Sequence, residues 1–188
     1  VFLNYNSSYL ERMLEQLLDE AESPEVTRFL RAVDVRIDGF RVEKAPEWRG
    51  QRVFVRHEVD GKGYELRLSE ESAGTQKLMG LAAYLMTALE RGATVVVDEL
   101  DAKLHPKLLR YVILLFKDPE VNKHGAQLIF SSQDVSTMRN DVFRRDEIWF
   151  AARGEGEASQ LWSLADIHEA NGNLVSKNAA FDKQYLSG

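Results

Sequence analysis

Apolar residues recur at helical spacing in four segments of the chain, and each segment carries signals for where a helix begins or ends. Ser8 and Glu11 fit the pattern of a capping box at the start of the first segment. Pro24 and Pro106 suit the first turn of the second and fourth segments, and Gly92 suits the end of the third. The spacing therefore predicts helices over residues 7–23, 23–33, 72–92 and 105–116.

Strands are predicted by two other patterns. Residues 35–44, 52–59 and 64–69 alternate apolar with polar positions and are separated by turn-forming residues, which predicts an antiparallel meander with one exposed face. Residues 94–99 and 126–132 are apolar without alternation, which is typical of parallel strands that are buried on both faces.

The order of helices and strands from residue 72 onward indicates an α/β fold, with a parallel sheet covered by helices on both faces. The meander precedes this part, and helical residues precede the meander. We therefore divide the chain into a helical segment (1–34), a core (35–168) and a polar C-terminal tail (169–188).

Two features near the C-terminus complete the prediction. Residues 147–164 resemble a β-hairpin that turns at Gly154–Gly156, and Trp149 and Trp162 on its opposite arms are expected to pack together. The tail from Asn171 is rich in Asn, Ser and Gly and is expected to be loop-like.

Composition narrows the function classes. With 188 residues and 44% hydrophobic content the chain can bury a core, and the absence of cysteine excludes disulfides and thiolate metal sites. A formal charge of −6 argues against a surface built mainly for nucleic acid, although it leaves a local basic patch open. The sequence contains no apolar run of about 20 residues and no signal-peptide pattern at its start, so we expect a cytoplasmic location and no membrane partner.

Two adjacent carboxylates, Asp98 and Glu99, directly follow the apolar residues of the 94–99 strand. In open α/β sheets, ligands bind beyond the carboxyl ends of the strands. One carboxylate there could hold Mg²⁺, and the other could accept a proton from an attacking water. The alternative is a strand that simply ends in polar residues at the surface, and the pair alone does not decide between the two.

Small residues also mark the start of the 72–92 helix. Ser72 and Gly74 would let a ligand approach the backbone, where free amides and the helix dipole favour an anion, and Gln76 adds a side-chain donor. The alternative is an ordinary N-cap formed by Ser72 with a bend at Gly74, which is the better-supported interpretation of this segment in isolation.

The two segments together resemble a known set of motifs. Ser72–Gln76 resembles a variant of the ABC signature motif, and Val95–Glu99 resembles a Walker B strand with its catalytic glutamate. Leu100–Ala102 matches a D-loop, and His105-Pro106 follows it. In this order, residues 66–167 are similar to the SMC-like, ABC-type AAA-family ATPases of bacteria, which are relatives of the OLD family and are often encoded in phage-defence operons.

The resemblance implies a P-loop NTPase fold, ATP and Mg²⁺ as cofactors, and a homodimer that sandwiches nucleotide and controls an effector protein encoded nearby. Asp98 would hold Mg²⁺, and Glu99 would polarise the attacking water. Ser72 and Gly74 would contact the γ-phosphate bound to the opposite subunit, and Asp101 would link the two sites. The residues expected at the nucleotide are Ser72, Gly74, Gln76, Asp101 and Gln133.

The chain departs from the family pattern by lacking a phosphate-binding loop of the form Gly-x4-Gly-Lys-Ser/Thr. Its one Gly-Lys pair, Gly61-Lys62, lies in a predicted hairpin turn. We therefore expect the chain to be the C-terminal half of an ATPase, inactive alone, with the loop supplied by a preceding segment or by another polypeptide.

A second departure lies at Gln133, where the family usually has a histidine near the γ-phosphate. Glutamine can donate and accept hydrogen bonds, but it cannot carry a proton charge. Two hypotheses therefore stay open, a hydrolysing ATPase and a non-hydrolytic, nucleotide-sensing scaffold. A third, a nucleic-acid-binding clamp head, rests on fold analogy alone.

Overall fold

The structure is a computed structural model that describes residues 2–3, 24–32, 37–44, 51–154, 156, 158–168, 176 and 181. The chain divides into two compact units, Val1–Gln133 and Asp134–Gly188. The helix expected over residues 7–23 lies outside the described residues. The boundaries expected after residues 34 and 168 stay predictions. Within the described part of the chain, no helix combines the length and apolar character needed to cross a membrane.

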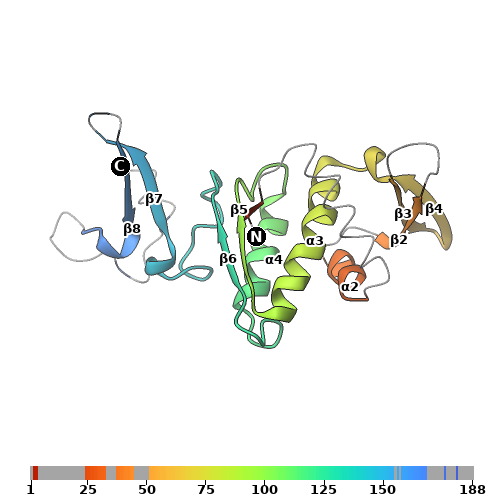
Figure 1. Cartoon of the computed structure of the whole chain (residues 1–188), viewed down its shortest axis with the longest axis horizontal. Coiled ribbons are helices and arrows are strands. Elements are labelled where there is room, and N and C mark those ends of the chain that lie inside the picture. Colours follow the sequence, from red (N-terminus) through yellow and green to blue (C-terminus); the bar gives the residue numbers. More distant parts are fainter. Residues whose placement is uncertain are drawn as a thin grey trace. The chain divides into compact units, whose positions relative to one another are not determined.

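The first unit contains a parallel sheet, and its central strand leads into the acidic pair. Its strands are β1 (Phe2–Leu3), β5 (Thr94–Val97) and β6 (Gln127–Phe130), in the order β1-β5-β6, and both pairings are parallel (Figure 1). Helix α3 (Ala73–Arg91) packs against β5, and helix α4 (Pro106–Lys117) packs against β6. The predicted parallel sheet with helices packed on it is thus confirmed for these elements, whereas the expected cover of both faces is not.

The predicted helix ends are confirmed as well. The side chain of Ser72 caps α3, and Gly92 ends it with a φ of +64°, a left-handed conformation that suits glycine. Helix α4 begins at Pro106 behind the N-cap residue His105, whose ring nitrogen accepts a hydrogen bond from the Lys107 amide. Helix α3 therefore ends shortly before β5, and helix α4 begins after the residues that follow β5.

Burial along β6 differs from the prediction. A strand apolar throughout was expected to be covered on both faces, but Ile129 is 55% exposed while its neighbours Leu128 and Phe130 are half-buried. In register, Val95 and Val97 lie opposite Leu128 and Phe130 and are buried. One face of β5 and β6 therefore packs into the core, whereas the opposite face is open at Ile129.

The antiparallel pairing of the meander is confirmed in the first unit, but its third strand is exposed at every position and not on one face only. The meander consists of β2 (Ile37–Lys44), β3 (Gln51–Val59) and β4 (Lys62–Arg67), paired in that order. Asp60 and Gly61 have φ values of +52° and +72°, which suits the tight turn between β3 and β4. Helix α2 (Pro24–Ala32) packs against β2 and α3, and the 3-10 helix η1 (Leu68–Glu70) leads from β4 into α3.

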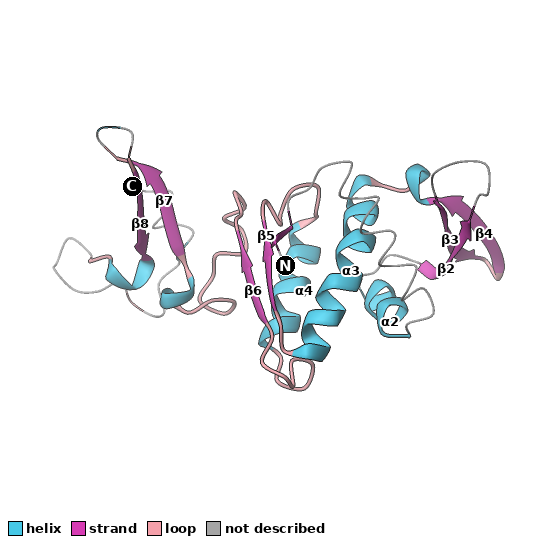
Figure 2. Cartoon of the chain, in the orientation of Figure 1, coloured by secondary structure: helices cyan, strands magenta, loops and turns pink. Residues whose placement is uncertain are grey.

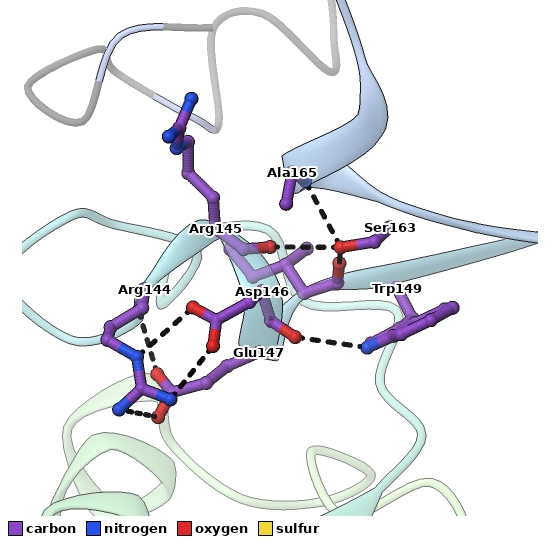
Figure 3. A network of polar contacts seen from close by, with 8 residues as sticks. Arg144, Arg145, Asp146, Glu147, Trp149, Ser163 and Ala165 are labelled. Atoms are coloured by element: carbon purple, nitrogen blue, oxygen red, sulfur yellow. Dashed lines mark hydrogen bonds and ion pairs between the residues drawn. The ribbon is translucent and has the colours of Figure 1, made fainter. Parts of the chain in front are cut away.

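The second unit is built on the predicted hairpin, formed by β7 (Trp149–Arg153) and β8 (Ser159–Ser163) (Figure 2). It is flanked by the 3-10 helices η2 (Arg145–Glu147) and η4 (Leu164–Asp166). The Ser163 hydroxyl links η2 to η4. It lies 3.4 Å from the carbonyl oxygen of Arg145 in η2 and accepts a hydrogen bond from the amide of Ala165 in η4 at 3.1 Å (Figure 3). Arg144 pairs with Asp146 beside this contact.

The expected packing of the two tryptophans is wrong. Trp162 lies opposite Phe150 in the hairpin and packs against it, with 6.1 Å between ring centroids. Trp149 lies opposite Ser163 and is 57% exposed. Since neighbouring register positions point to opposite faces of a hairpin, the two indoles are separated by the sheet itself.

Phe181 shows that the tail expected to be loop-like is anchored at one residue. Its side chain is 1% exposed and packs in a cluster with Ile148 and Leu164. The apolar residues of this tail follow neither a helical nor a strand period, so the pattern did not predict this contact.

Replacing Phe181 with alanine is expected to lower the free energy of unfolding of the second unit by about 3–5 kcal/mol, because it leaves a cavity in this cluster. Urea denaturation followed by tryptophan fluorescence measures the change. Leu161→Ala, at a position 66% exposed on the same hairpin, is the control and should change stability by less than about 0.5 kcal/mol. Equal effects of the two variants would contradict the anchoring of the tail.

Candidate functional site

The acidic loop, residues 98–104 between β5 and α4, is held against the end of β6. The pairing of Val97 with Phe130 brings Ser131 beside the loop. The Ser131 hydroxyl donates to a carboxylate oxygen of Asp98 at 2.5 Å and accepts a hydrogen bond from the Glu99 amide at 2.8 Å. Sequence reasoning missed Ser131, although a serine directly after the neighbouring parallel strand was a signal that could have found it.

Glu99 combines an exposed side chain with an unusual backbone. Its φ is +49°, and Lys103 at the other end of the loop has a φ of +64°. For residues other than glycine this left-handed conformation costs roughly 1–2 kcal/mol each. Such strain persists only where surrounding contacts enforce it, and it clusters at functional sites. The loop is thus a candidate site on backbone geometry as well as on charge.

Asp101 and Gln133, which were expected at the same nucleotide, do lie together. The backbone amide of Gln133 donates a hydrogen bond to one carboxylate oxygen of Asp101 at 3.3 Å. The other oxygen, Oδ1, is buried and has no hydrogen-bond partner among the described residues. The side chain of Gln133 is exposed.

Ser72 and Gln76 at the start of α3 are both engaged by their own chain. The Ser72 hydroxyl accepts a hydrogen bond from the Thr75 amide at 3.1 Å, which confirms the N-cap interpretation. The side-chain amide of Gln76 donates to the Glu71 carbonyl at 2.8 Å. These contacts order the segment before α3, and a contact of either residue with phosphate stays a prediction.

Gly74 is where α3 meets the acidic loop. A Cβ atom at this position would lie 2.8 Å from the backbone carbonyl oxygen of Lys103. Such a separation is closer than carbon and oxygen tolerate, so only glycine allows this approach. The structure therefore shows the chain's own loop, at Lys103, close to the backbone that was expected to receive a ligand.

Lys77 is a buried cation that sequence reasoning did not single out. Its side chain is 1% exposed, and its ammonium group donates to the carbonyl oxygens of Glu99 at 2.6 Å and Ala102 at 2.9 Å. Burial lowers the pKa of Lys77, while the carboxylates of Asp101 and Glu99 act in the opposite direction. The sequence does carry a signal for this residue, because Lys77 lies on the apolar face of α3, one turn before Leu81.

The acidic loop could hold Mg²⁺ together with a nucleotide, through a single carboxylate. Within the described ranges, no three His, Asp or Glu residues are grouped so as to hold a metal ion by themselves. Magnesium that binds together with a nucleotide needs only one or two protein carboxylates, since waters and phosphates supply the other ligands. Asp98, whose carboxylate is oriented by Ser131, matches that requirement.

Comparison with protein families gives a match over most of the chain. A family model described as "AAA domain, putative AbiEii toxin, Type IV TA system" matches residues 3–139. The match spans α3, the acidic loop and Ser131. No curated protein matches the chain.

Replacing Gly74 with alanine is expected to lower the free energy of unfolding by about 1–3 kcal/mol through its clash with the Lys103 carbonyl. Glycine to alanine inside a helix is normally stabilising by about 1 kcal/mol, so the sign of the change is diagnostic. Thermal or urea unfolding gives that sign. Gly63→Ala, where no atom lies within 4 Å of the added Cβ, is the control and should not destabilise. Stabilisation by Gly74→Ala would show that the loop does not approach α3 this closely.

Proposed function

The chain belongs to this family of AAA domains, and we propose that it supplies the acidic half of a Mg²⁺-dependent ATP-hydrolysing site. The observation that carries the proposal is the acidic loop itself. Asp98 is oriented by Ser131, and next to it Glu99 is held in a left-handed conformation with its carboxylate exposed. A left-handed glutamate at the carboxyl end of a parallel strand supports a functional role, because such strain clusters at functional sites and ligands of α/β sheets bind beyond these strand ends.

Each carboxylate has its own role in this proposal. Asp98 would hold the magnesium ion, which when bound neutralises charge on the phosphates. Glu99 would accept a proton from the attacking water, and its exposed side chain leaves room for that water. Because phosphoryl transfer depends mainly on positioning and charge stabilisation, a rigid backbone under both side chains matters as much as their chemistry.

Further segments would complete the site in this proposal. A phosphate-binding loop would come from a preceding segment or another polypeptide, because the pattern Gly-x4-Gly-Lys-Ser/Thr does not occur in the sequence. We further propose that the domain works as an SMC-like, ABC-type head, in which Ser72 and Gly74 of one subunit face the γ-phosphate held by a second copy. The 19-residue helix that begins behind Ser72 supports this, since its dipole favours an anion at that end.

The dimer would switch a partner protein. The family description names a toxin of a toxin–antitoxin system, and the motif order resembles OLD-related ATPases of phage defence. We therefore propose that ATP binding and release control an effector encoded nearby, in bacterial antiviral defence.

Gln133 favours one alternative, a non-hydrolytic scaffold that senses nucleotide. It occupies the position where a histidine is usual, and its backbone amide contacts Asp101. A site of this kind would bind ATP and dimerise without turning it over.

Replacing Glu99 with glutamine is expected to lower kcat for ATP by about 10²–10⁴-fold in the full-length natural protein, because the variant keeps the shape of the side chain and loses the proton acceptor. ATP binding should be retained. Phosphate release under steady-state conditions and nucleotide titration measure the two quantities. Glu120→Gln, an exposed glutamate beyond α4, is the matched control and should leave both unchanged.

The two hypotheses give different results in the same assay. Wild-type turnover that Glu99→Gln abolishes supports the ATPase. Binding without turnover in both proteins supports the scaffold, and failure of the full-length protein to bind ATP contradicts both.

Replacing Ser72 with aspartate tests the contact across the dimer. Aspartate is as good an N-cap as serine, so α3 should stay capped, but its charge would repel a facing phosphate. We expect ATP-dependent dimerisation, measured by light scattering coupled to size exclusion, to weaken at least about tenfold. Ser72→Asn keeps the cap without the charge and should dimerise nearly as wild type does. Undiminished dimerisation of the aspartate variant would contradict a phosphate near Ser72.

A further inference from the structure

Lys77 and Ser131 both hold the acidic loop at the Glu99 backbone. The amide of Glu99 donates to the Ser131 hydroxyl, and the carbonyl of Glu99 accepts from the Lys77 ammonium group. The residue is thus held on both sides of its Cα. Since its φ of +49° is unfavourable, contacts of this kind are what the conformation requires.

The same ammonium group reaches the middle of the loop. It donates a hydrogen bond to the carbonyl oxygen of Ala102. The Ala102 amide in turn donates to the Glu99 carbonyl oxygen at 3.1 Å. Asp101 lies between these two residues in sequence, and its electrostatic attraction to Lys77 favours the charged lysine. The lysine therefore closes the loop into a compact turn and supplies positive charge near the buried carboxylate oxygen of Asp101.

Lys77 belongs to α3, three residues after Gly74, and this links the loop to the helix start. The Lys103 carbonyl approaches Gly74, and Ser72 caps the same helical turn. The first turns of α3 and the acidic loop are thus joined at two places, at Gly74 through close packing and at Lys77 through two hydrogen bonds. A movement of the first turns of α3 would therefore displace the Glu99 backbone.

We propose that Lys77 is a positioning residue for the hydrolytic step: it fixes the backbone of Glu99 and so directs the Glu99 carboxylate, and it ties that carboxylate to the start of α3. Lys77 acts through backbone oxygens of the loop. The effect of Lys77 on the rate of hydrolysis rests on the proposed function, whereas the hydrogen bonds of Lys77 to the loop are a property of the fold alone.

The first test is amide hydrogen exchange of the full-length protein with Lys77→Met, which keeps an unbranched side chain and removes the donors. The Leu100, Ala102 and Leu104 amides donate within the loop or to Ser131. They should exchange at least about tenfold faster in the variant, while amides in β2 to β4 keep their rates. Lys107→Met, an exposed lysine at the start of α4, is the matched control and should leave the loop unchanged. Unchanged loop exchange in Lys77→Met overturns the proposal.

The second test is a double-variant cycle on single-turnover ATP hydrolysis. Misplacement of a catalytic group by about 1 Å costs on the order of 10²-fold, so Lys77→Met should lower the rate by about that factor with ATP affinity unchanged. In the Glu99→Gln background the same change should have little further effect, because the group that Lys77 positions is already lost. Equal losses in both backgrounds, or a loss confined to ATP affinity, overturns the positioning role.

The two tests separate this inference from the proposed function. Suppose that Lys77→Met speeds amide exchange in the loop while the wild type does not hydrolyse ATP. The contacts of Lys77 with the loop are then supported, and only the proposed ATPase activity is contradicted. If Lys77→Met does not fold, Lys77→Gln, which keeps one amide donor, replaces it in both tests with the same expected directions.

Discussion

The parallel pairing of β5 with β6 is the constraint on which the rest of the candidate site depends. Because Val97 pairs with Phe130, the residues that follow each strand emerge side by side, and Ser131 reaches both Asp98 and the Glu99 amide. The loop that leaves β5 then turns sharply, through left-handed backbone at Glu99 and Lys103. The hydrogen bonds of Ser131 and Lys77 to the Glu99 backbone offset the cost of that turn.

The start of α3 has two roles that the same residues must satisfy. Ser72 caps the helix, and Gly74 admits the Lys103 carbonyl, so both are needed for the fold irrespective of any ligand. In the proposed ATPase they also face a phosphate of a second copy. Small residues serve both purposes for the same reason, since each requires a close approach to the backbone. The same residues therefore fit both the structural and the functional interpretation of the segment.

Local patterns predicted much of the fold, and contacts across strands decided the rest. The helical spacing in 72–92 and the caps at Ser72 and Gly92 were sufficient for α3, because capping is a local interaction. The openness of β6 at Ile129, the burial of Phe181 and the roles of Ser131 and Lys77 depend on tertiary neighbours. The acidic pair was identified from its position after an apolar strand, whereas the residues that orient it become apparent only from the register.

Magnesium-dependent ATP hydrolysis at the acidic loop is the central claim, and a crystal structure of the full-length protein with Mg²⁺ and a non-hydrolysable ATP analogue tests it most directly. The claim predicts Asp98 bound to the ion at about 2.1 Å or through one water. It also predicts the Glu99 carboxylate within about 2.6–3.2 Å of a water in line with the γ-phosphate. Nucleotide bound away from the ends of β5 and β6, with Asp98 and Glu99 in contact with neither ion nor water, would contradict it.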